Sequence, residues 1–355
     1  MAIKKLKNGK WELDIRDFNG KRIRKKFNKK IDAELLETEI KSNRNKGLSS
    51  VIDKSITIKD ACEYFLEKHV KIHCKQKTYD EGKIIVNSKI IPYFGNMKLC
   101  NLTKVHVENF MAYLLSLNLS NATVNKYKNT LSSIIERQIE NGTIFQNVVK
   151  KVKSLKIYKS NKAKALTEDE YNKLLDTCLQ VKPEFYPMLY IILNTGMRRG
   201  EIIALRWENV DFVRNKIYIK DSEYRAQLDT PKTITSIRDI DMHADVRKIL
   251  LEQKLKAGNS EFVFPNSKGG MFMGNNVTRR LFAPVMKASG IGHVRLHDTR
   301  HTYGSLLLEN NAPVKYVQEQ MGHSSCRVTL DIYNHSSEKS KEVANEILTK
   351  VRKAS

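Results

Sequence analysis

The sequence predicts a multidomain, mainly α-helical chain that also contains small β-sheets. Its 355 residues suit two or three domains, and a hydrophobic fraction of 41% allows real cores. Helix-capping residues and apolar residues at helical spacing recur from residue 55 onward. Strand-like segments are short, and they occur only near the N-terminus and in two stretches of the last domain.

Residues 1–53 are predicted to form a three-stranded sheet followed by a helix. Two Asn-Gly turn signals separate the strands, Asn8-Gly9 and Asn19-Gly20. A helix is expected over 32–45, before Gly47. Residues 1–55 hold 16 Lys and Arg against 8 Asp and Glu, which suits a unit that reads a DNA groove. A lid or an oligomerisation module is the alternative.

Residues 55–150 are predicted to form a small helical bundle. Helix starts are expected at three capping threonines, Thr57, Thr78 and Thr103. The last helix of the bundle is expected over 121–141, before Gly142.

A basic interdomain linker is predicted over 151–166. No acidic residue occurs between Ile144 and Thr167. The lysines of this stretch are candidates for contacts with DNA phosphates: Lys150, Lys151, Lys153, Lys156, Lys159, Lys162 and Lys164. The alternative is a solvated connector that contacts nothing.

Residues 167–355 are predicted to form a last domain that is mostly helical. It begins with a capping box, Thr167 with Glu170, and two strands are expected near 216–220 and 235–241. An apolar stripe marks a final helix, at Val343, Ile347, Leu348 and Val351.

The charge balance points to a polyanionic partner. Lys and Arg number 63 against 39 Asp and Glu, a formal net charge of +24. Nucleic acid is favoured over an anionic membrane surface, because no segment approaches the roughly 18 consecutive apolar residues of a spanning helix. Five scattered cysteines without a C-x-x-C pair favour neither disulfides nor a zinc finger. With no apolar signal-peptide stretch, a reducing cytoplasm is expected.

Four short segments of the last domain carry side chains suited to phosphate chemistry. They are T-G-M-R-R-G-E at 195–201, P-K-T at 231–233, H-D-T-R-H at 297–301, and G-H-S-S with T-L-D-I-Y at 322–333. Arg198 at a helix start makes an anion site, and Glu201 one turn later is placed to hold its guanidinium. His297 and Arg300 share one helix face. His297 and His301 have metal-ligand spacing, but the glutamate of H-E-x-x-H is absent, so no metal site is predicted.

Each of these residues alone has an ordinary explanation. Arg198 suits a surface ion pair, Lys232 an exposed turn, His323 a helix cap, and Tyr333 is one of 14 tyrosines. Only their combination, in this order and spacing, is specific.

The combined set resembles the signature of the tyrosine recombinases, the integrase family of phages and conjugative transposons. The set is Arg198, Lys232, His297, Arg300, Gly322-His323 and Tyr333. Three blocks resemble the family over most of their length: T-G-M-R-R-G-E-I-I-A-L-R-W, L-H-D-T-R-H-T-Y-G-S-L-L-L and M-G-H-S-S-C-R-V-T-L-D-I-Y-N-H. The resemblance covers the whole catalytic domain. More loosely, it covers the helical middle domain and the N-terminal unit, which look like core-type and arm-type DNA-binding domains.

Departures from the family pattern are small. Ten residues lead from His323 to Tyr333, where many relatives have nine, and Tyr303 stands where a smaller residue or His is common. Lys232 is the least secure assignment, because Lys216 and Lys220 also lie on or beside the predicted strands.

The resemblance implies that Tyr333 attacks a DNA phosphodiester and leaves a 3′-phosphotyrosine and a free 5′-hydroxyl. Two arginine forks, Arg198 and Arg300, would stabilise the non-bridging oxygens. Lys232 would protonate the leaving 5′-oxygen, and His297 would act as the base or orienting group. His323 would donate to the phosphate. No metal, ATP or other cofactor is expected.

The implied activity is integration and excision of a mobile element by a site-specific recombinase. The implied partners are double-stranded DNA at core and arm sites, three further copies of the chain in a tetramer, and an accessory excision or bending protein. No membrane partner is expected, and the location would be the nucleoid in a bacterial cytoplasm. In the family the final helix docks on a neighbouring protomer, and docking on its own domain is the alternative.

Three rival functions remain open at this point. A type IB topoisomerase shares the chemistry, and a catalytically silent regulator would bind DNA without cleaving it. A metal-dependent nuclease would use His297, Asp298 and His301.

Overall fold

A computed structural model of the chain describes residues 2–16, 20, 22–45, 55–157, 165–229 and 237–333. For residues 39, 43–45 and 331–333 it describes the backbone alone. The chain divides into two compact units, Met1–Tyr158 and Lys159–Ser355. Among the described residues, no helix is long and apolar enough to cross a membrane.

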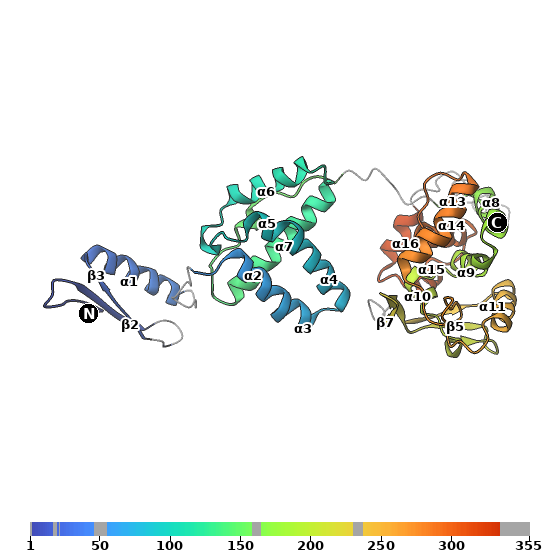
Figure 1. Cartoon of the computed structure of the whole chain (residues 1–355), viewed down its shortest axis with the longest axis horizontal. Coiled ribbons are helices and arrows are strands. Elements are labelled where there is room, and N and C mark those ends of the chain that lie inside the picture. Colours follow the sequence, from blue (N-terminus) through green and yellow to red (C-terminus); the bar gives the residue numbers. More distant parts are fainter. Residues whose placement is uncertain are drawn as a thin grey trace, which may run out of the picture. The chain divides into compact units, whose positions relative to one another are not determined.

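The N-terminal segment forms an antiparallel sheet with one helix packed on it (Figure 1). The strands β1, β2 and β3 lie in sequence order, and α1 follows: β1 (Ile3–Lys5), β2 (Trp11–Arg16), β3 (Arg22–Phe27) and α1 (Lys30–Asn45). Buried Leu13 and Ile23 pack with Ala33 and Ile40 of α1. The predicted sheet-plus-helix is therefore confirmed, with the helix starting two residues earlier than expected.

The opposite face of this sheet carries charge. Side chains alternate along strands, and the register pairs Asp14 with Arg24 and Arg16 with Arg22 on the face away from α1. Asp14 accepts two hydrogen bonds from Arg22, at 2.8 and 2.7 Å, and one of 2.9 Å from Arg24 Nη2. Both guanidinium groups are about half exposed, so this face presents two arginines held by one carboxylate.

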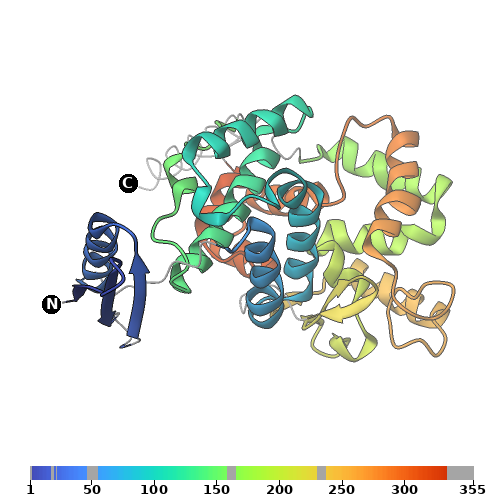
Figure 2. The ribbon, with the colours of Figure 1, turned by 60° about the vertical axis from the view of Figure 1, so that its left-hand side comes forward.

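The middle segment is a helical bundle, as predicted (Figure 2). Its α-helices are α2 (Ile58–Tyr64), α3 (Lys71–His73), α4 (Gln76–Ile85), α5 (Ile91–Phe94), α6 (Lys104–Ser116) and α7 (Asn121–Glu140). Wider π-helical turns, Phe65–Val70 and Val86–Ile90, join α2 to α3 and α4 to α5. Short 3₁₀ turns occur at Leu99–Asn101 and Val148–Lys151.

Two of the three expected caps in the bundle are confirmed. Thr57 forms a capping box with Asp60, and Thr103 forms one with His106. The expected cap at Thr78 is wrong, because α4 already begins at Gln76 and the extended residue before it is Lys75. The chain leaves α3 through an extended Cys74, so the turn that starts α4 comes earlier than the Thr-x-x-Glu pattern suggested.

The residues that follow the bundle lie along α7. Asn125 forms two hydrogen bonds with the backbone of Leu155, at 2.8 and 2.9 Å, and Lys128 donates to Ser154. Val152 is buried in the bundle core. The first part of the stretch expected to be a linker is thus fastened to the bundle by specific contacts.

The second unit is a mostly helical domain with two small sheets (Figure 1). Its strands are β4 (Val210–Asp211), β5 (Lys216–Ile219), β6 (Ser222–Tyr224), β7 (Gln227–Asp229) and β8 (Arg238–Asp241). Its helices are α8 (Glu168–Val181), α9 (Tyr186–Thr195), α10 (Arg199–Ile203), α11 (Ala244–Lys256), α12 (Gly274–Asn276), α13 (Ala283–Ser289), α14 (Asp298–Glu309), α15 (Val314–Met321) and α16 (Cys326–Tyr333). Further helical turns lie at Pro183–Phe185, Trp207–Asn209 and Val277–Phe282.

The sheet order β4-β5-β8 includes both strands predicted from sequence, while the hairpin β6–β7 was not predicted. Its turn is made by Arg225 and Ala226, both at positive φ (54° and 58°). Because neither residue is Gly or Asn, the usual turn signal is missing. The Thr167 capping box is confirmed at the start of α8.

The core of this domain surrounds α9, whose apolar residues are buried nearly all round. α9 packs against α8, α11 and α14 and is followed directly by the turn into α10. The starts of α10 and α14, which carry the sequence motifs, are therefore positioned by one rigid core.

Candidate active site

Arg198 lies at the start of α10, as predicted, and is held there by Glu201. Its backbone N–H donates to Glu201 Oε2 at 2.8 Å, and its Nη1 donates to Glu201 Oε1 at 2.7 Å. Nη2 donates to the carbonyl of Gly322 at 2.9 Å. About a third of the Arg198 side chain stays exposed, so the fork is fixed but still open to an anion.

Glu201 is buried and holds a second arginine that the sequence reading missed, Arg238. Arg238 donates from Nη1 and Nη2 to the two Glu201 oxygens at 3.1 and 3.0 Å. Burial alone would raise the pKa of Glu201, but the charge of Arg238, followed by Arg198 and Arg300, lowers it to about 2. Glu201 is therefore ionised at neutral pH. Arg238 lies on a strand and belongs to none of the motifs, so no local sequence signal singles it out.

Arg300 comes from the first turn of α14 and is almost fully buried. Its guanidinium donates to the carbonyls of Gly196 and Met321. Burial, followed by the nearby charge of Arg198, lowers the pKa of Arg300 to about 9, which still leaves it positive at pH 7. Arg198 and Arg300 thus place two positive charges side by side at the starts of two helices.

The approach between α9 and α14 requires glycine at position 196. Gly196 adopts φ +60°, and a Cβ there would lie 2.5 Å from Tyr303 Cδ1. Tyr303, which had no predicted role, therefore packs its ring against the turn that supplies a carbonyl to Arg300.

Three histidines border the arginine pair. His297 is the residue before α14, and its ring meets that of His301 edge-on at 5.3 Å between centroids. Desolvation, followed by the charges of His301 and Arg300, lowers the pKa of His297 to about 4, although part of the ring is exposed. Desolvation, followed by Arg300 and Arg198, lowers the pKa of His323 to about 3. Both rings are therefore neutral at pH 7, and His323 Nδ1 shares a 3.0 Å hydrogen bond with Thr329.

Of the predicted site residues, one lies outside the described structure and one has only its backbone described. Lys232 lies outside the described residues. Tyr333 is the last residue of α16, and its side chain is not described. The hairpin β6–β7, whose last strand ends three residues before Lys232, packs against α10. The chain that leads to Lys232 therefore starts next to the helix that Arg198 begins.

The two other lysines considered for the general acid are already engaged. Lys216 forms ion pairs with Asp239 at 2.5 Å and Asp241 at 2.8 Å, and the hydrogen bonds to them raise its pKa. Lys220 stacks over the ring of Tyr218 with its Nζ 5.9 Å from the centroid. A lysine stabilised in its charged form by two carboxylates is a poor proton donor, which disfavours Lys216.

The lysines of the predicted linker differ in their surroundings. Lys150 pairs with Glu136 at 2.7 Å, and Lys151 donates to Gln146. Lys153 and Lys156 are exposed. The other three lie outside the described residues: Lys159, Lys162 and Lys164.

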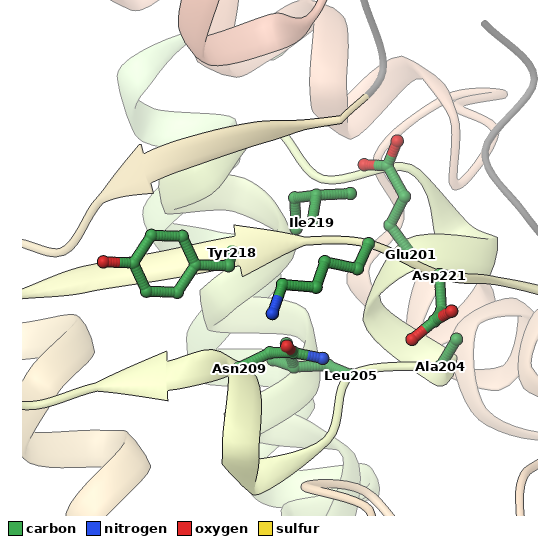
Figure 3. Close-up of a pocket in the computed structure, with 8 residues that line it drawn as sticks. Glu201, Ala204, Leu205, Asn209, Tyr218, Ile219 and Asp221 are labelled. Atoms are coloured by element: carbon green, nitrogen blue, oxygen red, sulfur yellow. The ribbon is translucent and has the colours of Figure 1, made fainter. Parts of the chain in front are cut away.

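No cluster of metal ligands accompanies these residues in the described part of the chain. No three His, Cys, Asp or Glu side chains come together there as metal ligands. Figure 3 shows a small hollow beside α10, bordered by Glu201, Asn209 and Tyr218. The empty space of this hollow, counted together with adjoining solvent, is about 160 Å³.

Two family models match the chain. Residues 164–340 match the model described as "Phage integrase family", and residues 57–115 match "Phage integrase, N-terminal SAM-like domain". The first match contains every motif residue from Arg198 to Tyr333, and the second falls within the helical bundle.

Full-length relatives show the same relationship. The ICEBs1 integrase of Bacillus subtilis is 26% identical over 98% of this chain and 99% of the relative. A XerC-like tyrosine recombinase of Caldanaerobacter subterraneus is 25% identical over 97% of both chains.

Solved structures share the fold. The Tn1549 transposon integrase in complex with transposon right-end DNA has a TM-score of 0.69 at 20% identity, over 83% of this chain and all of that one. A lambda integrase tetramer bound to a Holliday junction has a TM-score of 0.66 at 19% identity, over 93% of this chain and 94% of that one.

Proposed function

Since the chain belongs to the phage integrase family of site-specific recombinases, we propose that it integrates and excises a mobile element by cleaving and rejoining DNA through Tyr333. The observation that carries this proposal is the meeting of Arg198 and Arg300, from motifs about a hundred residues apart, beside His297 and His323. No single motif predicts that these two arginines lie close together.

The arginine pair suits stabilisation of a phosphoryl-transfer transition state. Each guanidinium is fixed by protein acceptors and carries further N–H donors for the non-bridging oxygens. Preorganised donors of this kind act where charge develops, and removal of one typically costs about 10²–10³ in rate.

Proton transfer is assigned to residues that surround the arginine pair. Tyr333 loses its phenolic proton on attack, and His297, the residue before α14, is the assigned acceptor or orienting group. His323 donates a hydrogen bond to the phosphate, and Lys232 protonates the leaving 5′-oxygen. The phosphotyrosine ester conserves the energy of the broken phosphodiester, so rejoining needs no ATP, and the positive side chains make a metal unnecessary.

DNA binding is divided among the domains in this proposal. The helical bundle and the exposed lysines after it bind core-site DNA. The charged sheet face with Arg22 and Arg24 binds a separate arm site. A solved lambda integrase tetramer on a Holliday junction supports a tetramer of this chain on DNA. The protein acts at the nucleoid of a bacterial cytoplasm, with an accessory excision or bending protein.

A joining assay distinguishes this function from its rivals. Two differently labelled duplexes carrying the ends of the host element are incubated with the protein in the presence of EDTA. Recombinant junctions identify a recombinase. Plasmid relaxation without junctions would identify a topoisomerase, and binding without either would identify a silent regulator. Cleavage that EDTA abolishes would identify the nuclease.

A further inference from the structure

We propose that Arg238 is a positioning residue for cleavage, which locks Glu201 and the end of α15 together and so aims Arg198 and Arg300 at the phosphate. This inference rests on the proposed function of the two arginines. Arg238 lies on β8, outside every motif that suggested the activity.

Each nitrogen of the Arg238 guanidinium donates to a protein acceptor. Only 6% of its side chain is exposed, and its partner Glu201 is 2% exposed. Its two terminal nitrogens bind both oxygens of Glu201, and its Nε donates to the carbonyl of Gln320 at 2.6 Å. These hydrogen bonds connect β8, α10 and α15.

Three consecutive carbonyl groups at the C-terminal end of α15 accept hydrogen bonds from three arginines. Arg238 takes the carbonyl of Gln320, Arg300 that of Met321, and Arg198 that of Gly322. The last carbonyls of a helix have no partner within the helix and carry its negative dipole end, so they are strong acceptors for cations. His323 follows at once in the chain, and its own N–H closes back on the carbonyl of Gln318 at 3.1 Å.

Arg238 therefore fixes both supports of Arg198. One support is Glu201, to which Arg238 donates two hydrogen bonds. The other is the C-terminal end of α15, where Gly322 accepts a hydrogen bond from Arg198. The same α15 end supports Arg300. A shift of about 1 Å in catalytic groups is enough to cost roughly 10²-fold in rate, so a residue that only positions others has a measurable effect.

Replacing Arg238 with lysine tests whether the planar guanidinium is needed or only its positive charge. Arg238→Lys keeps the positive charge but loses the planar fork that spans Glu201 and Gln320. Arg206→Lys is the matched control, because Arg206 also bridges two carboxylates of this domain, Glu208 and Asp221, at 2.8 and 2.9 Å. Arg206 contacts none of the proposed site residues in its ion pairs.

The test is the single-turnover rate of covalent adduct formation on a nicked suicide duplex at saturating protein. Arg238→Lys is expected to slow this step about 10- to 100-fold while the Kd for the duplex stays within about threefold. Arg206→Lys is expected to react at the wild-type rate. A wild-type rate for Arg238→Lys, or an equal loss in both variants, would overturn the inference.

A double-mutant cycle checks that Arg238 acts through its neighbours. In an Arg198→Ala background the loss caused by Arg238→Lys should shrink at least about threefold, since one of its targets is gone. An undiminished loss would overturn the positioning role. If the wild-type protein forms no adduct at all, the proposed function fails and this inference fails with it.

A second variant of Arg238 keeps the test open if the first one does not fold. Should Arg238→Lys melt before the assay temperature, Arg238→Gln replaces it, because its amide keeps a donor for Glu201 and Glu201 keeps Arg198 as a counter-charge. This variant is expected to bind DNA and form adduct slowly. Adduct formation at the wild-type rate would overturn the inference.

Discussion

Arg198 and Gly322 are joined by a 2.9 Å hydrogen bond from the arginine Nη2 to the glycine carbonyl. This contact ties the first arginine motif to the segment that bears His323 and leads into α16, at whose end Tyr333 lies. Met321, one residue earlier, accepts from Arg300. The backbone just before His323 is therefore hydrogen-bonded to both arginines, so its position is coupled to theirs.

Replacement of Glu201 tests the electrostatic support of the site. Glu201→Gln leaves Arg238 buried without a full counter-charge, so the free energy of unfolding should fall by about 3–5 kcal/mol. Adduct formation should also slow. Glu208→Gln is the control, since that glutamate is an exposed partner of Arg206 and its loss should cost under about 1 kcal/mol. Urea denaturation measures both, and equal costs would contradict the account.

Replacement of Gly196 tests the close approach of α9 and α14. Gly196→Ala combines a left-handed backbone with a Cβ pressed on Tyr303, so it should destabilise the domain by about 2–4 kcal/mol. Gly258→Ala shares the positive φ but meets open space, and should cost only about 1 kcal/mol. The difference between the two melting temperatures isolates the contact. Equal melting temperatures for the two variants would mean that the Tyr303 ring moves aside without cost, which would contradict the account.

The pH dependence of stability follows from the two neutral histidines. In the unfolded chain both titrate near pH 6.5, whereas folding lowers the pKa of His297 to about 4 and that of His323 to about 3. The unfolded state therefore binds more protons below pH 6.5. Stability should be fully present above that pH and decline as the pH falls towards 4 and 3.

Melting temperatures between pH 8 and 4.5 measure this decline. The variant His297→Asn/His323→Asn should show a shallower fall than the wild-type protein. Identical slopes would show that other groups dominate the acid sensitivity.

The charged sheet face predicts a separable role for the N-terminal segment. Deletion of residues 1–53 should leave covalent cleavage of core DNA intact and reduce integration. Asp14→Ala should weaken arm-site binding in the full chain, because Arg22 and Arg24 lose the carboxylate that aligns them. Lys30→Ala, which alters the α1 side, is the control. Full integration by the truncated protein would refute the arm-binding role.

The sequence was sufficient for the architecture where local signals are strong. The Asn-Gly turns and the caps at Thr57, Thr103 and Thr167 are local signals, and the sheet, the bundle and the start of the last domain followed from them. The ion pair of Arg198 with Glu201 was likewise predictable, because one helical turn separates the two.

Features that depend on tertiary contacts were not predictable. Arg238 and Glu201 are 37 residues apart in the sequence, and only the tertiary fold brings β8 and α10 together at this ion pair. The hairpin turn at Arg225 and Ala226 is held in an unusual backbone conformation without Gly. The convergence of three arginines on α15 combines residues from β8, α10 and α14, and no local pattern specifies it.

The most direct test of the central claim is covalent trapping on a nicked suicide duplex, analysed by denaturing gel and peptide mapping. The wild-type protein should form an adduct through a 3′-phosphate attached to the peptide that contains Tyr333. Tyr333→Phe should bind the same duplex with unchanged Kd and form no adduct. Adduct formation by Tyr333→Phe, or attachment through a different residue, would contradict the account.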